Sequence, residues 1–338
     1  MKPLAIFVVV FTFIAQAWCA PSEDEKAKFL AGLAVKDAGL EAQMKQPIWT
    51  AYAAWMDKKW TRMNERQLNF VRAWAPGGLG GIYGTRGSIF YTFSGPDLIY
   101  PLTFFPHASS YILCGTEPVG YVPDMTGMPP ETLAANLRNM TVSLNTMLRT
   151  HYFITKDMRV DLERGQVQGT LPLLYVILAR SNCAIRSVNV SGSMAQIDFT
   201  SPAGGKQTVY YFKTDLSNGG ENAAFFRFCK AHAPGVSLVK AASYLMHGDG
   251  FSKVRNFLLT NSSAIVQDDS GIPWRDFDAK RWNVRLFGRY EDTIELFKDK
   301  VQPDLAAAYK SSHPAPLGFS FGYAWQREKG MLMLATPK

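Results

Sequence analysis

The stretch that decides the fold is residues 88–123, SIFYTFSGPDLIYPLTFFPHASSYILCGTEPVGYVP. It contains two apolar runs, at residues 89–93 and 111–114. Both are rich in the β-branched and aromatic residues that fit a pleated, buried surface. The pattern therefore predicts two strands.

The segment between the two runs predicts a short helix. Ser94 is a capping residue, Pro96 can occupy the first helical position, and Asp97 places an acid in the first turn. A helix over residues 96–105 would make the two strands parallel neighbours joined by a crossover. Pro101 opposes this interpretation, because within a helix a proline removes a hydrogen bond. The alternative is a three-stranded meander with Pro101 on an edge strand.

Three apolar runs each end in an acidic turn, and this repetition predicts a site. If the strands are parallel neighbours, their turns meet at the carboxyl edge of the sheet, where open α/β sheets place ligand crevices. Like charges at a shared site raise each other's pKa or hold a metal. The alternative is that turn aspartates bond only to their own backbone. The candidate catalytic carboxylates are Asp97 and Glu117, after the first two runs, and Asp268 and Asp269, after the run at residues 264–267.

Other candidate site residues lie in or near these turns. His107 follows Pro106 and is a candidate acid or base, because the ordinary pKa of histidine is near 6.5; a solvated turn histidine is the alternative. The sequence has 8 Trp, 14 Tyr and 22 Phe, and aromatic side chains line both cores and sugar-binding clefts. The candidate ligand-binding residues are Ser94, Tyr91, Tyr121 and Trp274.

Three short motifs match known patterns but lack the partner residues that those patterns require. Residues 318–322, GFSFG, match the G-x-S-x-G nucleophile elbow, but no His follows Gly322, so we interpret the segment as a strand. Residues 237–240, SLVK, match S-x-x-K at the frequency expected by chance, and we predict a helix over residues 237–246. His247 and Asp249 have the spacing of a metal-binding pair but no further ligand, so the metal, if any, is unknown.

The N-terminus has the pattern of an export signal. Lys2 precedes an apolar run at residues 4–15, which is followed by small residues up to Ala20. The run is too short to span a bilayer. We therefore expect residues 1–20 to be an export signal and the protein to be exported, periplasmic or extracellular. A lipid-modified Cys19 is the alternative, against which bulky Trp18 argues.

The charge distribution, the hydropathy and the cysteines limit the class of partner and the number of disulfides. The formal net charge is +8, but no basic run is interleaved with aromatics, so no nucleic-acid partner is indicated. No apolar run is long enough for a membrane span. Beyond the signal, Cys114, Cys183 and Cys229 are an odd number, which allows one disulfide and a free thiol or three buried thiols.

The chain divides into four segments by composition. Residues 1–20 are the signal, 21–76 a helical N-terminal segment packed on the main domain, 77–87 a glycine-rich connector, and 88–338 the main domain. Within the second segment, large side chains recur at spacings of four and three from Trp49 to Trp74, which predicts one amphipathic helix between Pro47 and Pro76. Strands and helices alternate irregularly, so the fold class is α+β: a mixed central β-sheet flanked by helices, with a long N-terminal amphipathic helix.

These features favour an exported protein that binds a polar small molecule, such as a glycan, in a cleft lined by carboxylates and aromatics. The first alternative is a secreted hydrolase that uses the same carboxylates directly or through a divalent metal. The second is an envelope scaffold or lipoprotein without catalysis. From the sequence, the cofactor and the oligomeric state are unknown.

Overall fold

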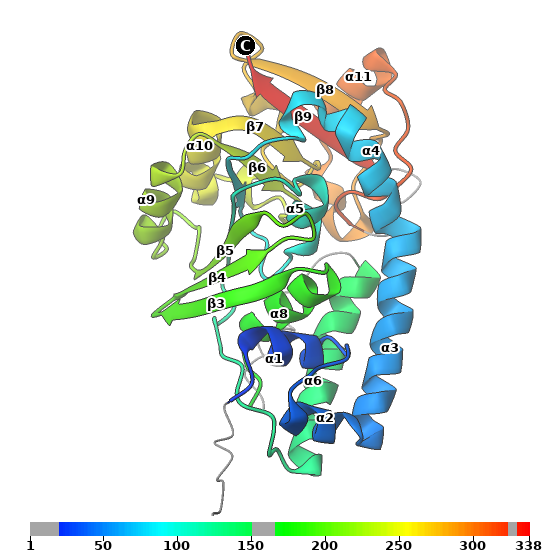
Figure 1. Cartoon of the computed structure of the whole chain (residues 1–338). Coiled ribbons are helices and arrows are strands. Elements are labelled where there is room, and N and C mark those ends of the chain that lie inside the picture. Colours follow the sequence, from blue (N-terminus) through cyan, green and yellow to red (C-terminus); the bar gives the residue numbers. More distant parts are fainter. Residues whose placement is uncertain (1–19, 151–165, 324–329) are drawn as a thin grey trace, which may run out of the picture.

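The computed structural model describes residues 20–150, 166–323 and 330–338 (Figure 1). The expected signal, residues 1–20, lies outside these residues except for its last one. The described chain has the predicted α+β class. Its strands form one mixed sheet in the order β3-β4-β5-β2-β1-β6-β7-β9-β8.

The centre of the sheet is parallel and its two ends are antiparallel. The parallel strands are β1 (Ser88–Tyr91), β2 (Ser110–Gly115), β5 (Lys206–Lys213), β6 (Gly235–Val239) and β7 (Ser262–Gln267). The antiparallel strands are β4 (Met194–Thr200) and β3 (Ala184–Ser191) beside β5, and β9 (Met331–Pro337) and β8 (Trp282–Gly288) beside β7. Every residue of β1 and β6 is buried, as expected of parallel strands covered on both faces.

The prediction of strand, short helix and strand in residues 88–123 is confirmed. β1 and β2 are parallel neighbours, with Tyr91 opposite Leu113, and the chain between them forms α5 (Ile99–Phe104). The meander is therefore wrong. Pro101 is tolerated because it is the third residue of α5, where the backbone N–H would have no intrahelical partner.

The remaining helices lie in two groups (Figure 1). One group contains α1 (Glu23–Leu30), α2 (Ala38–Met44), α3 (Pro47–Met63), the π-helical turn η1 (Asn64–Leu68), α4 (Asn69–Leu79), η2 (Gly80–Ile82), α6 (Pro130–Thr150) and α8 (Leu171–Arg180). The other contains α9 (Ala223–Ala231), η3 (Leu245–His247), η4 (Asp249–Phe251), α10 (Ser252–Asn261), η5 (Trp274–Asp276) and α11 (Pro303–Ser312). The short η6 (Glu295–Lys300) belongs to neither group and packs through Phe297 against Tyr244 and Tyr323.

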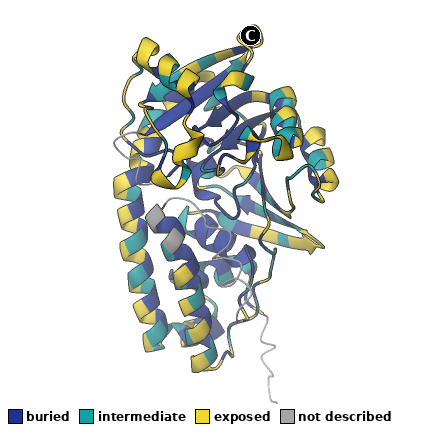
Figure 2. Ribbon diagram, turned by 180° about the vertical axis from the view of Figure 1, so that it is seen from behind, coloured by how far each residue is buried: buried dark blue, intermediate teal, exposed yellow. Residues whose placement is uncertain are grey.

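The two groups cover opposite faces of the sheet. Successive side chains of β1 alternate between the faces, so Ile89 and Tyr91 pack in a core with α1, α3 and α8, whereas Phe90 packs in a second core with α9, α10 and α11. Figure 2 shows the buried sheet between exposed helical surfaces. Cys114, Cys183 and Cys229 are buried free thiols, which agrees with the second of the two cysteine alternatives.

Three local predictions are wrong. Pro76 does not end the helix but lies inside α4, which extends to Leu79 and takes up the first glycines of the connector; near a helix end a proline costs one hydrogen bond and its φ stays helical. Residues 237–246 are not a helix, because their first part is the buried strand β6. Residues 318–322 form bends rather than a strand, with Gly322 at φ +96°.

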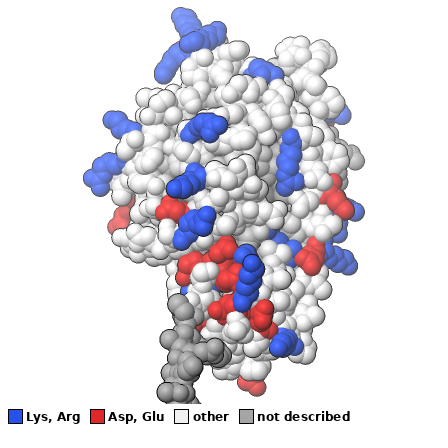
Figure 3. All heavy atoms as spheres, in the orientation of Figure 1, with Lys and Arg blue, Asp and Glu red and all other residues white. Residues whose placement is uncertain are grey.

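Acidic residues gather on one face of the molecule over α1 (Figure 3). The first turn of α1 holds Glu23, Asp24 and Glu25, where the helix dipole favours negative charge. These carboxylates also dock the helix: Asp24 accepts a hydrogen bond from the backbone N–H of Ile185, and Glu23 from the hydroxyl of Tyr175. The acidic patch therefore has a structural explanation.

Candidate functional site

The sheet topology places a crevice between β1 and β6. From β1 the chain passes through α5 to β2 on one side, whereas β6 lies on the other side of β1 and leads on to β7. Adjacent parallel strands whose connections run in opposite directions leave a gap at their carboxyl ends, and this gap is the usual ligand site of open α/β sheets.

A cavity of about 270 Å³ occupies this position. Its walls come from the residues at or after the carboxyl ends of β1, β2, β5 and β6 and from η3 and η4. They are Phe93, Gly95, Cys114, Gly115, Thr116, Thr214, Asp215, Leu216, Ala241, Ala242, Ser243, Leu245 and Phe251. We call this cavity the carboxyl-edge crevice. It is slightly smaller than the pockets that hold drug-sized ligands.

The backbone around the crevice is held in an unusual conformation. Phe93, Ala241 and Ser243 have φ values of 58°, 50° and 53°, in the left-handed region that non-glycine residues rarely adopt. Such residues cost about 1–3 kcal/mol each and persist only where their surroundings hold them; they gather at ligand sites.

The turn after β7 holds the strained turn after β6. The carboxylate of Asp268 accepts a hydrogen bond of 2.9 Å from the backbone N–H of Ala241, and the hydroxyl of Ser270 accepts one of 2.7 Å from Ala242. The other oxygen of Asp268 accepts from the backbone and hydroxyl of Ser270. Asp268 therefore positions one wall of the crevice without lining it.

A buried lysine directly precedes Ala241 of the crevice wall. Lys240 directly follows β6, its side chain is fully buried, and its Nζ lies 3.5 Å from Oδ2 of Asp97 and 4.2 Å from the centre of the Tyr100 ring. Tyr91 donates a hydrogen bond of 2.9 Å to the same carboxylate oxygen. Burial lowers the pKa of Lys240 and raises that of Asp97, because water no longer solvates either charge.

The other two carboxylates are also buried. Oδ2 of Asp269 accepts a hydrogen bond of 2.6 Å from Tyr244, and burial together with the charge of Asp268 raises the pKa of Asp269 to about 8. Oε2 of Glu117 accepts one of 3.3 Å from Tyr211. Oδ1 of Asp269, Oε1 of Glu117 and Oδ1 of Asp97 are buried without a hydrogen-bond partner among the described residues.

The four predicted carboxylates therefore lie at one edge of the sheet but not in the crevice. Asp97 is 2% exposed, and Glu117, Asp268 and Asp269 are 0% exposed. Among the described residues, Asp215 is the one carboxylate that lines the crevice. The predicted ligand residues Ser94 and Tyr91 are buried nearby: Ser94 bridges β1 and β2 through Cys114, and Tyr91 contacts Asp97.

Three predicted site residues lie apart from the crevice. His107 is exposed at the amino end of β2, the opposite edge of the sheet, where its ring packs edge-on against Tyr83. Tyr121 is half exposed and pairs with Gln168. Trp274, in η5, donates its backbone N–H to Gln302.

Lys240, Phe93 and Phe251 were not among the predicted site residues. The sequence does hold a signal for Lys240, namely a charged residue that follows an apolar run. Lys240 follows the run of β6, in the same way as Asp97 follows the run of β1. The assignment of residues 237–246 to a helix concealed it. Phe251 reaches the crevice from η4, and no local pattern indicates this.

Comparisons with family models, with curated proteins and with solved structures give no match for this chain. In the described part of the chain, no group of three or more His, Cys, Asp or Glu side chains could hold a metal ion. A search of the same residues finds no helix with the length and apolarity to cross a membrane.

Proposed function

We propose that this protein is exported and binds a small polar ligand, the size of one sugar unit of a glycan, in the carboxyl-edge crevice. The observation that carries the binding proposal is the cavity at the switch point between β1 and β6, lined by three non-glycine residues in the left-handed region. Export rests on the sequence pattern of residues 1–20.

The walls of the crevice suit a sugar ring. Phe93 and Phe251 stand edge to face with their centroids 5.8 Å apart, and they give the cavity an aromatic side. Thr116, Thr214 and Ser243 add polar groups. An aromatic face packs against the C–H groups of a sugar while a few polar groups orient its hydroxyls.

Binding has more support than hydrolysis by the predicted carboxylates. A glycoside hydrolase needs two carboxyl groups on either side of the scissile bond, roughly 5–9.5 Å apart. Asp97 and Asp268 instead contact Lys240 and the Ala241 backbone, and neither lines the crevice. We therefore assign them the role of holding the loops in place.

Titration calorimetry and saturation-transfer NMR with glucose, galactose, mannose and N-acetylglucosamine test the proposal. We expect at least one sugar to bind, and Phe251→Ala to weaken its binding about tenfold, because the variant removes an aromatic wall. Leu296→Ala is the control, since Leu296 is 74% exposed and outside the crevice.

Two results would count against this function. The first is no saturation transfer from any of the four sugars at millimolar concentration. The second is binding that Phe251→Ala and Leu296→Ala leave equally unchanged. Release of reducing sugar from oligosaccharides, lost in Asp268→Asn, would favour the hydrolase instead.

A further inference from the structure

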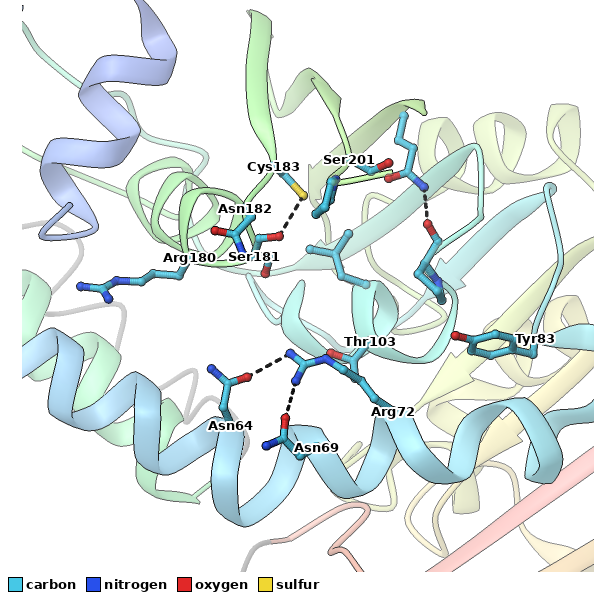
Figure 4. A pocket seen from close by; sticks show the side chains of 14 residues that line it. Asn64, Asn69, Arg72, Tyr83, Thr103, Arg180, Ser181, Asn182, Cys183 and Ser201 are labelled. Carbon is cyan, nitrogen blue, oxygen red and sulfur yellow. Dashed lines mark hydrogen bonds between the residues drawn. The ribbon is translucent and has the colours of Figure 1, made fainter. Parts of the chain in front are cut away.

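A second and larger cavity lies at the opposite edge of the sheet. Its volume is about 540 Å³, within the range of ligand pockets. It lies between α4, the end of α8 and the amino ends of β2 and β5, and it shares no residue with the carboxyl-edge crevice. Figure 4 shows Asn64, Asn69 and Arg72 on one side, with Ser181 and Asn182 across from them. We call this cavity the amino-edge pocket.

Arg72 gives the pocket an uncompensated positive charge. Its Nη1 donates a hydrogen bond of 2.8 Å to Oδ1 of Asn69, and its Nη2 one of 3.0 Å to Oδ1 of Asn64. Amide oxygens orient a guanidinium but do not neutralise it. Among the described residues no carboxylate pairs with Arg72, and no Asp or Glu lines the pocket. The two contacts use two of the five N–H donors of the guanidinium, so three remain.

The π-helical turn η1 aligns Arg72 with Asn64. At 3.6 residues per turn, residues eight apart in an α-helix point about 80° away from each other. The π turn takes up one extra residue, so the two behave as residues seven apart and lie on the same face. Single π turns occur frequently at functional sites.

Gln207, which lines the pocket, has a buried acceptor without a donor in the described part of the chain. Gln207 is 6% exposed, and its Nε2 donates hydrogen bonds of 2.8 Å and 2.7 Å to the carbonyl oxygens of Pro106 and Ala108. These two acceptors fix the amide orientation, because only the nitrogen can face them. Its Oε1 is therefore directed away from them and has no partner among the described residues. A buried acceptor without a hydrogen bond costs free energy, and a ligand hydroxyl group could donate the missing hydrogen bond.

We propose that the amino-edge pocket binds a small hydroxylated anion, such as a sugar acid or a sugar phosphate. Arg72 binds the anionic group through its remaining donors, in the forked geometry that suits carboxylate and phosphate. Oε1 of Gln207 accepts a hydrogen bond from a ligand hydroxyl. Arg180 contributes no second charge contact, because its guanidinium points away from the pocket, toward Ala31 and Asp57.

Titration calorimetry on the full chain tests this site with glucuronate, glucose-6-phosphate, glucose and inorganic phosphate. We expect glucuronate or glucose-6-phosphate to bind at least tenfold more tightly than glucose and than inorganic phosphate. Arg72→Gln should weaken that binding by roughly 10- to 100-fold, the usual effect of losing a charged hydrogen-bond donor. Arg62→Gln is the matched control, an exposed arginine of α3 outside the pocket that carries the same change of charge.

A second variant tests the charge without removing the arginine. Asn69→Asp places a carboxylate on Arg72 with almost no change of shape, so it should weaken anion binding as much as Arg72→Gln does. The proposal is overturned if neither hydroxylated anion binds at millimolar concentration, or if Arg62→Gln weakens binding as much as Arg72→Gln. Inorganic phosphate or glucose binding as tightly as the sugar anions would also overturn it.

Discussion

At the scale of single residues, Lys240 connects the stability of the fold to the candidate site. It is a fully buried cation between β1 and β7, where Asp97 is its ion-pair partner and the charge of Asp268 also acts on it. Desolvation penalises each of these charges, and each is tolerated because the others are present. The residue that follows Lys240 forms a wall of the crevice. A change at Lys240 should therefore affect both stability and the crevice.

Replacing Lys240 with methionine should destabilise the protein by about 3–5 kcal/mol. The substitution leaves the Asp97 carboxylate buried without its cation, which is the costly way to break a buried ion pair. Urea denaturation monitored by circular dichroism measures the free energy of unfolding. The double variant Lys240→Met with Asp97→Asn should recover part of the loss, because it removes both charges.

The control for this cycle is an exposed ion pair. Lys298 and Glu295 lie 2.9 Å apart with both side chains mostly exposed, so Lys298→Met should change the stability little. A Lys240→Met variant as stable as the Lys298→Met variant would contradict the role given to the buried pair.

At the scale of elements, two loops cross closely and fix the chain after β2. The backbone at residues 118–121 exchanges hydrogen bonds with residues 168–171, and Tyr121 and Gln168 form a bridge. Gly120 has φ +72°, and a Cβ there would lie 1.8 Å from the carbonyl oxygen of Gln168. The crossing follows Glu117 directly, so it holds the second acidic turn at the edge of the sheet.

Gly120→Ala should therefore destabilise the protein by several kcal/mol, since the new methyl group clashes with backbone and the left-handed φ is unfavourable for alanine. Thermal unfolding followed by circular dichroism measures the change. Gly127→Ala is the matched control, because a Cβ at Gly127 meets nothing within 4 Å. Equal melting temperatures for the two variants would show that the loops do not cross as described.

The elements also show how much the sequence could predict. The sequence from β1 to β2 contains an apolar run, a turn, a short helix and a second apolar run. This local pattern was enough to predict that Asp97 lies at the end of a strand, beside the acidic turn that follows β2. Its burial is not local, because its partner Lys240 lies 143 positions away in the chain. His107 illustrates the same limit. It precedes β2 and therefore lies at the amino edge of the sheet, whereas the acidic turns lie at the carboxyl edge. Only the pairing of the strands shows that these are opposite edges. The π turn of η1 is also invisible to helical periodicity: the predicted stripe continues to Phe70, but the extra residue of the turn shifts the buried face to Leu68 and Val71 and leaves Phe70 44% exposed.

At the scale of the whole molecule, the N-terminal helices and the sheet share one core. Phe29, Trp49 and Leu68 belong to the same buried cluster as Tyr91 and Tyr111 of the central strands. Gln67 in η1 donates hydrogen bonds to the Tyr100 hydroxyl and to the Ser320 carbonyl oxygen, which joins three distant parts of the chain. Removal of α1 to α4 would leave only α5, α6 and α8 on that face and expose the rest of its core to water, and parallel sheets are stable only when both faces are covered.

A chain that begins at residue 80 should therefore fail to fold into the native state. We expect it to retain far-ultraviolet circular dichroism, lose the near-ultraviolet signal of packed aromatics and bind a hydrophobic dye, as compact states without fixed packing do. A chain that begins at residue 20 is the control, and it should unfold in a single cooperative transition at the temperature of the full chain. If the chain from residue 80 instead gave a sharp thermal transition with native near-ultraviolet bands, the sheet and its second helical layer would be an independent domain. The helices α1 to α4 would then be an addition to it and not half of its core.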